Sequence, residues 1–316
     1  MIYSETVSVI CICYNHAPWI VECLESVRLQ NYSSKELFVV DNGSTDNSLE
    51  VIEKWINESS GSIPVELISI SESRPYPQVF NEILAKTKGQ FIIDLSGDDV
   101  LYPEHFSISV SMLKKSPEAA FVFSDAYILD DEEVVKTFYK RKTGGELIEV
   151  IETSKIYETL VKSYSICSPT VVFNRPILVK EGGYDEQLSY EDFDIQIRMA
   201  RKYPLLFSDH VGVLKREHDD SMSSHQYQAY DSKMLPSTLI VCQKIKEMNE
   251  TEDENSALKS RVLYELKHAL WSANFEVAKG FIDLGVEIGI KNPIFLVYKI
   301  WASLKLDISW LYTRVA

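Results

Sequence analysis

Apolar runs and amphipathic segments alternate through the first half of the chain. Five apolar, β-rich runs predict buried strands, at residues 7–13, 36–40, 65–70, 91–95 and 119–124. Four segments with apolar residues every three or four positions predict helices between them, near 18–30, 44–55, 79–88 and 103–117. This alternation predicts an α/β fold with a parallel sheet and helices on both of its faces.

The pattern changes after about residue 126. A helix, a strand, a second helix and a second strand are predicted there, at 154–163, 170–173, 191–201 and 205–215. Beyond residue 226 the apolar spacing is helical, with breaks expected at 250–255, near Gly280 and at 291–293. We therefore predict two domains, the first formed by residues 1–225 and the second, a helical C-terminal region, by residues 226–316.

Charge limits what the protein can bind. Its 316 residues include 47 acidic and 32 basic side chains, which give a formal net charge of −15. Nucleic acid requires a basic surface, so we expect no nucleic-acid partner. An acidic protein that binds an anionic nucleotide must place its positive charge locally or bind a cation.

Cysteine usage and the absence of membrane signals predict a cytoplasmic protein. The five cysteines have no metal-type spacing and mostly lie in apolar runs, which predicts reduced thiols. The first basic residue is Arg28, so the N-terminus does not resemble a secretory signal. No stretch contains the ~18 apolar residues of a membrane-spanning helix.

Two polar clusters follow predicted strands. The chain contains neither G-x-G-x-x-G nor G-x-x-x-x-G-K-[ST], which argues against a dinucleotide dehydrogenase or a P-loop kinase. Instead, D-N-G-S-T-D at 41–46 and S-G-D-D at 96–99 fall beyond the carboxyl ends of strands, where parallel sheets bind ligands. The adjacent carboxylates of Asp98 and Asp99 favour Mg²⁺ or Mn²⁺. Taken alone, the pair is also typical of a turn with a helix-capping Asp.

Five motifs occur in order along residues 6–225. They are V-S-V-I-C-I-C-Y-N at 7–15, F-V-V-D-N-G-S-T-D at 38–46, F-N-E-I-L-A-K-T-K-G-Q-F-I at 80–92, S-G-D-D-V-L-Y-P at 96–103 and G-G-Y-D-E-Q-L-S-Y-E-D-F-D-I-Q-I-R-M-A at 182–200. Together they resemble glycosyltransferase family 2, an inverting group that includes bacterial polysaccharide and O-antigen-type sugar transferases. The resemblance implies the GT-A fold, a Rossmann-like α/β fold whose sheet is mixed but mainly parallel, with helices on both faces.

The resemblance implies that residues 1–225 bind a nucleotide sugar and catalyse its transfer. The sugar, of hexosyl or N-acetylhexosaminyl type, would move from a nucleoside diphosphate, with UDP favoured, to an acceptor hydroxyl. A divalent cation, Mn²⁺ or Mg²⁺, would assist. The implied acceptor is a saccharide or a lipid-linked saccharide, in cell-surface polysaccharide or glycoconjugate synthesis.

The same resemblance implies a set of nucleotide-binding residues. Tyr14 would lie near the base, and Asn42 would contact the base edge at a position where the family often has aspartate. Asp41 would orient the loop or contact base or ribose, although capping the turn through Gly43 explains it equally well. Arg74 would meet base or phosphate, or it is simply a solvated side chain.

Metal binding and catalysis are assigned in the same way. Asp98 would contact ribose and metal, and Asp99 would bind the metal directly. His218 would complete the metal or diphosphate site, and Arg216 would contact the diphosphate, unless both lie in an exposed loop. Asp192 would be the general base that inverting transfer requires, although a carboxylate here would also stabilise a helix N-terminus.

An apolar stripe marks the C-terminus. Its members recur every three or four residues: Ile294, Val297, Trp301, Leu304, Ile308 and Leu311. Residues 291–316 contain four basic residues and one acidic residue. The stripe fits packing on the preceding helices or on the second subunit of a homodimer, and it also fits peripheral contact with an anionic membrane.

Two other functions fit parts of the pattern. A sugar-nucleotide nucleotidyltransferase also combines an α/β core with an acidic metal site, but normally has a basic, Gly-rich loop after its first strand. Here that position holds Y-N-H-A at 14–17. A catalytically inactive nucleotide-binding module of the same fold would be expected to lack Asp99 or Asp192, and both are present.

Overall fold

The computed structural model describes residues 4–59, 61, 63–130, 133–218 and 221–312. The chain forms two compact units. The first contains Met1–Ser154, Ile166–Glu186 and Lys202–Glu217, and the second contains Lys155–Ser165, Gln187–Arg201 and His218–Ala316. Both units are therefore built from separated segments, and the boundary expected near residue 225 falls within the second unit.

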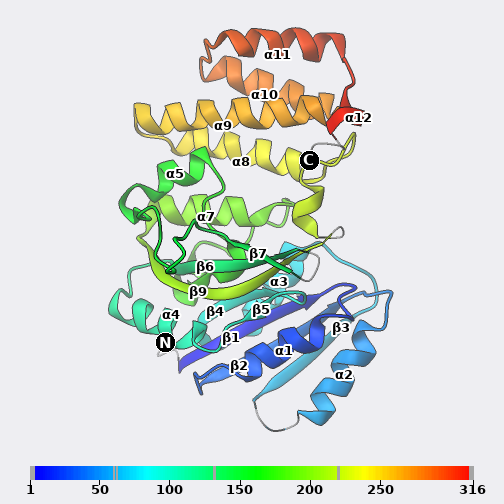
Figure 1. Cartoon of the computed structure of the whole chain (residues 1–316), viewed down its shortest axis with the longest axis vertical. Coiled ribbons are helices and arrows are strands. Elements are labelled where there is room, and N and C mark those ends of the chain that lie inside the picture. Colours follow the sequence, from blue (N-terminus) through cyan, green and yellow to red (C-terminus); the bar gives the residue numbers. More distant parts are fainter. Residues whose placement is uncertain (1–3, 60, 62, 131–132, 219–220, 313–316) are drawn as a thin grey trace. The chain divides into compact units, whose positions relative to one another are not determined.

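A nine-stranded sheet forms the centre of the first unit (Figure 1). Its strands follow the order β3-β2-β1-β4-β8-β6-β9-β5, and β7 pairs with β6. The strands are β1 Ser4–Cys13, β2 Lys35–Asn42, β3 Val65–Ile70, β4 Gly89–Ser96, β5 Val100–Leu101, β6 Phe121–Asp130, β7 Glu133–Thr137, β8 Val172–Asn174 and β9 Leu205–Glu217. The neighbours β3, β2, β1 and β4 are parallel, as are β6 and β9, while β8, β5 and β7 pair antiparallel. The predicted mixed, mainly parallel sheet is confirmed.

Helices cover both faces of this sheet. Five lie in the first unit: α1 Ile20–Arg28, α2 Ser48–Glu58, α3 Tyr76–Lys86, α4 His105–Lys115 and α6 Arg175–Lys180. Alternate residues of β1 point to opposite faces. Val9 and Cys11 share one core cluster with buried residues of α1, α2 and α4. Ile10 and Ile12 face the other way and are also buried, on the face where α3 packs against β1.

The second unit is helical. Its helices are α5 Ile156–Lys162, α7 Glu191–Lys202, α8 Met234–Met248, α9 Glu252–Trp271, α10 Phe275–Glu287, α11 Pro293–Leu304 and α12 Ser309–Tyr312. A short 3-10 turn occurs in it at Met222–His225, another at Thr153–Lys155 begins in the first unit and ends in the second, and a third at Ser168–Thr170 belongs to the first unit. Among the residues that the structure describes, no helix combines the length and the apolar character needed to cross a membrane.

The helical C-terminal region is present as expected, with one difference. The expected break near Gly280 is wrong, because α10 runs through this residue and the chain turns earlier, between Trp271 and Phe275. Gly280 allows two helices to approach closely. A Cβ atom at this position would lie 2.3 Å from Leu239 Cδ2 of α8.

Candidate active site

The carboxyl ends of three neighbouring parallel strands meet at one edge of the sheet. Cys13 of β1 is in register with Asp41 of β2, and Ile12 is in register with Ser96 of β4. The loops that begin at Tyr14, Gly43 and Gly97 therefore start side by side. This is where open parallel sheets bind their ligands, and both predicted polar clusters lie here.

Side-chain hydrogen bonds lock the first two loops together. Asn15 has a left-handed backbone, with φ of 58°. Its side-chain oxygen accepts from the backbone N–H of Thr45 at 2.7 Å, and its own N–H donates to Ser44 Oγ at 3.0 Å. Asp46 accepts from the N–H of Ala17 at 3.2 Å. These hydrogen bonds fix the loops after β1 and β2 relative to each other without the help of a ligand.

The third loop carries the paired carboxylates. The N–H of Gly97 donates to Ile12 O at 3.1 Å, and a Cβ atom on Gly97 would lie only 2.9 Å from His16 Nδ1. A side chain at this position would force the His16 and Ile20 side chains to shift, so glycine suits this close approach. Asp98 and Asp99 follow and are both buried, with only 7% and 3% of their surface exposed.

Arg216 of β9 holds this loop in place. Its backbone N–H donates to Asp99 Oδ1 at 3.1 Å, and its guanidinium donates to the carbonyl oxygen of Asp98 at 2.6 Å and to the carboxylate of Glu22. Arg216 is buried, so it is not part of an exposed loop. Its predicted contact with a diphosphate stays a prediction, and its observed partners give it a positioning role.

Burial and the neighbouring charge of Asp98 raise the pKa of the Asp99 carboxyl well above its usual range, although Lys215 and Arg216 oppose the shift. Two buried carboxylates this close are unfavourable when both are ionised. A hard divalent cation relieves that repulsion, because it prefers carboxylate oxygens. The donor set at this edge therefore fits Mg²⁺ or Mn²⁺.

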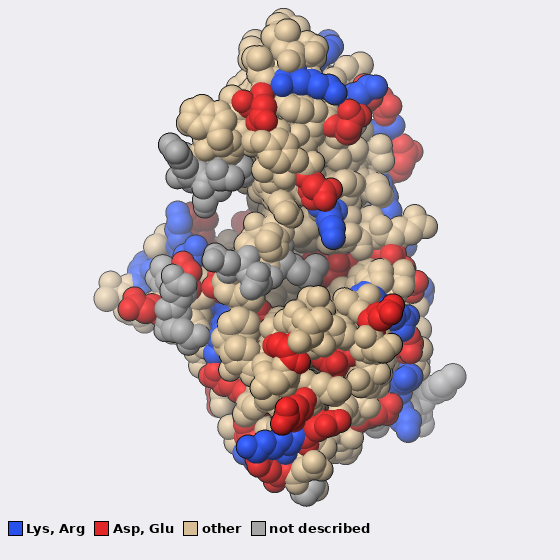
Figure 2. Space-filling model, turned by 90° about the vertical axis from the view of Figure 1, so that its right-hand side faces the viewer, with Lys and Arg blue, Asp and Glu red and all other residues tan. Residues whose placement is uncertain are grey.

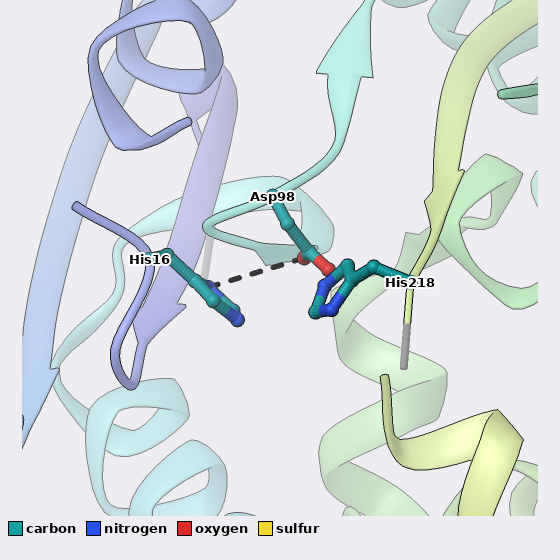
Figure 3. Close-up of side chains that lie close together, drawn as sticks. All are labelled: His16, Asp98 and His218. Carbon is teal, nitrogen blue, oxygen red and sulfur yellow. Dashed lines mark ion pairs between the residues drawn. The ribbon is translucent and has the colours of Figure 1, made fainter. Parts of the chain in front are cut away.

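Two histidines are relevant to such a cation. Figure 3 shows His16, whose Nδ1 lies 4.0 Å from Asp98 Oδ1. The third side chain drawn there is His218, the first residue of the second unit. Two peptide bonds separate His218 from Arg216, so their Cα atoms are at most about 7 Å apart. Sequence analysis did not identify His16, although it follows β1 within three residues.

The predicted nucleotide-binding residues have different surroundings. Tyr14 is exposed, as a base-stacking ring would be. Asp41 is buried, and its Oδ1 has no hydrogen-bond partner among the described residues. Its carboxylate makes no hydrogen bond to the turn at Gly43 within the described chain, so capping does not explain it. A buried carboxylate oxygen without a partner is costly and marks a position where a ligand can donate.

Asn42 and Arg74 bind each other instead. The side-chain amide of Asn42 donates to Arg74 O at 2.9 Å and accepts from the Arg74 N–H at 3.0 Å. The guanidinium of Arg74 pairs with Glu82 at 2.9 Å, and both side chains are exposed. The Asn42 amide therefore joins two loops, and its contact with a base edge stays a prediction.

Asp192 lies in the second unit, in the first turn of α7, and is half-buried. An aromatic cluster surrounds this turn: Tyr190 stacks on Phe193 with ring centroids 6.0 Å apart, and the Tyr164 ring is 5.6 Å from Tyr190. Burial, together with the charge of Asp192, raises the pKa of Tyr190 well above its usual range. Asp192 therefore lies in a helical turn that packed aromatic side chains hold in place.

Arg261 of α9 packs against the rings of this cluster. Its guanidinium lies 4.0 Å from the Tyr164 ring centroid and 4.7 Å from that of Phe193. It also donates to Glu265 at 3.1 Å and to the carbonyl oxygens of Leu160 and Val161. Sequence analysis missed this role, because an arginine and a glutamate four residues apart usually form an exposed pair.

Asn81 was quoted in a motif without a role. Its amide donates to Tyr184 O at 2.8 Å and accepts from the Tyr184 N–H at 2.9 Å. The hydroxyls of Tyr184 and Tyr76 donate to opposite oxygens of Asp94 in β4, at 2.7 and 2.5 Å. These bonds connect the F-N-E and G-G-Y-D motifs, which lie about a hundred residues apart in sequence.

Two solved structures have a fold similar to that of this chain. The structure of residues 1–349 of TarS from S. aureus, in complex with UDP-GlcNAc, has a TM-score of 0.71 and 17% identity, covering 98% of this chain and 92% of that one. The mannosyltransferase PcManGT from Pyrobaculum calidifontis, in complex with GDP-Man and Mn²⁺, has a TM-score of 0.60 and 17% identity, covering 96% and 87%. These similarities show the GT-A fold.

Sequence relatives point the same way. An uncharacterized glycosyltransferase of Rickettsia typhi is 24% identical over 220 residues, 69% of this chain and 65% of the relative. AmsE of Erwinia amylovora, an amylovoran biosynthesis glycosyltransferase, is 22% identical over 56% of this chain and 62% of its own. The chain thus spans less than two thirds of these relatives. Residues 8–178, more than half of the chain, match the sequence profile of Glycosyl transferase family 2. The protein belongs to this family.

Proposed function

We propose that the protein transfers a sugar from a nucleoside diphosphate to an acceptor hydroxyl with inversion at the anomeric carbon, and that residues 1–225 carry the catalysis. One observation supports the donor site above all: two adjacent carboxylates, Asp98 and Asp99, are buried at the carboxyl edge of parallel strands and fixed there by Arg216. Family membership supports the reaction class.

A divalent cation, Mn²⁺ or Mg²⁺, belongs in this proposal. Asp99 and Asp98 would hold it, with His218 as a further ligand, because each supplies an oxygen or nitrogen atom of suitable type. When bound, the cation neutralises the diphosphate and stabilises its departure. The structure of PcManGT with GDP-Man and Mn²⁺ lends support.

The nucleoside would bind between the first two loops. The free oxygen of Asp41 accepts a hydrogen bond from ribose or base, Tyr14 stacks on the base, and Asn42 and Arg74 shape the base pocket through their mutual bonds. We favour UDP, and the TarS complex with UDP-GlcNAc supports this choice. The transferred sugar would then be of hexosyl or N-acetylhexosaminyl type.

Asp192 would act on the acceptor. A sugar hydroxyl ionises poorly near neutral pH, so its proton must leave as the new bond forms. Asp192 takes that proton, and inversion requires it to do so from the face opposite the leaving diphosphate. Its position in the first turn of α7, next to the rigid aromatic cluster, supports this role.

The acceptor would be a saccharide or a lipid-linked saccharide. The product would belong to cell-surface polysaccharide or glycoconjugate synthesis, at the cytoplasmic side of the membrane. The similarity to AmsE, an amylovoran biosynthesis glycosyltransferase, supports a role in polysaccharide synthesis.

A binding screen tests the proposal. UDP with Mn²⁺ should raise the melting temperature, while UTP with a sugar phosphate, the substrates of a nucleotidyltransferase, should not do so more strongly. Nucleotide sugars that stabilise the protein should then be hydrolysed slowly when metal is present. Stabilisation by UDP without hydrolysis or transfer of any donor would instead indicate an inactive binding module.

A further inference from the structure

Helix α11 buries one face and exposes the opposite one. Phe295 and Tyr298 are buried within the second unit, where α11 packs on α9 and α10. The Phe295 ring lies against Gly285 of α10, where a Cβ atom would be only 2.6 Å from Phe295 Cζ. The Asn292 side chain caps the helix by accepting from the N–H of Ile294 at 2.9 Å. The helix is therefore anchored firmly, and its outer face is not a packing defect.

That outer face is apolar. Leu296, Val297, Ile300 and Leu304 fall within an arc of about 100° on a helix of 3.6 residues per turn. Between 53% and 61% of each side chain is exposed. Leu306 and Trp310, in the segment that follows the helix, are also exposed. We call the four residues of α11, Leu296, Val297, Ile300 and Leu304, the outer apolar face.

The exposed apolar residues differ in part from the stripe expected at 294–311. Of its members, Val297 and Leu304 lie on the outer apolar face, while Trp301 is half-buried and its indole N–H donates to Leu306 O at 2.7 Å. Packing on the preceding helices uses Phe295 and Tyr298 instead. Intramolecular packing therefore leaves the outer apolar face unused.

Lysines border this face. Lys291, Lys299 and Lys305 are exposed, in a chain whose net charge is −15. Lys305 Nζ lies 3.6 Å from a carboxylate oxygen of Glu276, and Lys299 Nζ lies over the Phe295 ring, 5.9 Å from its centroid. In Figure 2, a row of lysine or arginine atoms crosses the mostly tan end of the second unit that carries α11 in Figure 1.

We propose that the outer apolar face binds the surface of an anionic membrane. Its side chains enter the boundary between lipid headgroups and acyl chains, and Lys291 and Lys299 meet the lipid phosphates. An amphipathic helix with exposed aliphatic side chains and lysines beside them has the required chemistry.

A second copy of the chain is a poorer occupant. A 12-residue helix is about 18 Å long and 10 Å wide, so its outer face covers on the order of 200 Å². A stable protein interface buries ~800 Å² on each partner. Like-charged lysines of two copies would also gather at such a contact, whereas lipid phosphates would neutralise them.

Sedimentation with vesicles tests the proposal. The full chain should sediment with vesicles of equal parts phosphatidylglycerol and phosphatidylcholine, and much less with phosphatidylcholine alone. Binding should fall as salt is raised, because the lysine–phosphate attraction is screened. Leu296→Glu with Ile300→Glu should weaken binding by about tenfold or more, because two apolar side chains no longer enter the lipid. Lys291→Glu with Lys299→Glu should weaken binding only to the anionic vesicles.

The matched control is Ile148→Glu with Val150→Glu, which makes the same change at two exposed apolar residues of the first unit. It should bind vesicles like the unmodified chain. Equal vesicle binding by the Leu296/Ile300 variant would overturn the proposal, as would failure of the unmodified chain to bind. Analytical ultracentrifugation tests whether a second copy of the chain covers the face instead. If the unmodified chain forms a dimer and binds no vesicles, and the Leu296/Ile300 variant is a monomer, the face belongs to a dimer interface and the membrane proposal is overturned.

Discussion

Asp192 is the residue whose role is most open to a direct test. Asp192→Asn keeps the size of the side chain and much of its hydrogen bonding but removes the basic site. If Asp192 is the general base, this substitution should lower turnover by roughly 10²–10⁴-fold and leave UDP and metal binding intact. A helix-capping role predicts nearly normal turnover, because Asn and Asp are comparable caps. Turnover of the variant with a working donor and acceptor, measured beside its melting temperature, separates the two, and Glu191 is the next candidate if turnover survives.

A buried histidine pair predicts how stability depends on pH. His105 Nδ1 and His210 Nε2 lie 3.1 Å apart. Burial, with the neighbouring His210, lowers the pKa of His105 to about 3, and burial lowers that of His210 to about 4. Both pKa values are below the ~6.5 of a histidine in the unfolded chain. The unfolded state therefore takes up more protons than the folded state as the pH falls. Each imidazole should lower the free energy of unfolding by up to about 1.4 kcal/mol for every pH unit by which the pH falls, between about pH 6.5 and 4.

Urea unfolding at a series of pH values checks this prediction. The free energy of unfolding should fall below about pH 6.5. His105→Gln with His210→Gln should flatten the profile in this window, because neither imidazole is left to protonate. An unchanged slope in the double variant would show that other groups cause the acid sensitivity.

At the scale of elements, α9 stabilises the segments that hold Asp192. Arg261 and Glu265 are almost completely buried, and Glu265 accepts from Arg261 and from the hydroxyls of Tyr164 and Tyr227. Arg261→Met should cost about 3–5 kcal/mol, because it leaves the Glu265 charge buried without its cation. Adding Glu265→Leu should recover part of that loss, with a coupling of about 0.5–3 kcal/mol.

Denaturant unfolding of both single variants and the double variant measures this coupling. Lys54→Met with Glu58→Leu is a suitable control cycle, since that pair also lies four residues apart on a helix but is exposed. The control should show a coupling below about 0.5 kcal/mol. A similarly small value for Arg261 and Glu265 would mean that the buried pair does not hold this unit together.

Elements and the edge of the sheet were predictable because they depend on local pattern. The apolar runs gave β1, β2 and β4, and parallel pairing then brought Asp41 and Asp98 to one edge. Gly280 was misjudged because its reason lies in another helix, at Leu239. Arg261 and Asn81 were missed for the same cause: their partners are about a hundred residues away, and nothing local indicates burial.

At the scale of the whole molecule, an acidic protein is proposed to bind an anionic ligand. The chain carries a net charge of −15, and the candidate donor site adds two buried carboxylates. We therefore expect nucleotide binding there to require a cation between the carboxylates and the diphosphate. Metal dependence of nucleotide binding is therefore the central claim.

Isothermal titration calorimetry of UDP tests that claim most directly, with Mn²⁺ present or with EDTA. Asp99→Asn keeps an acceptor for the Arg216 N–H but removes the charged metal ligand, and Asp130→Asn makes the same change at the exposed end of β6. The unmodified chain and Asp130→Asn should bind UDP with Mn²⁺ and lose it in EDTA. Asp99→Asn should bind at least about 100-fold more weakly, because even changes to residues that only support a metal ligand cost 10–100-fold. Equal UDP affinity with Mn²⁺ and with EDTA would contradict the account.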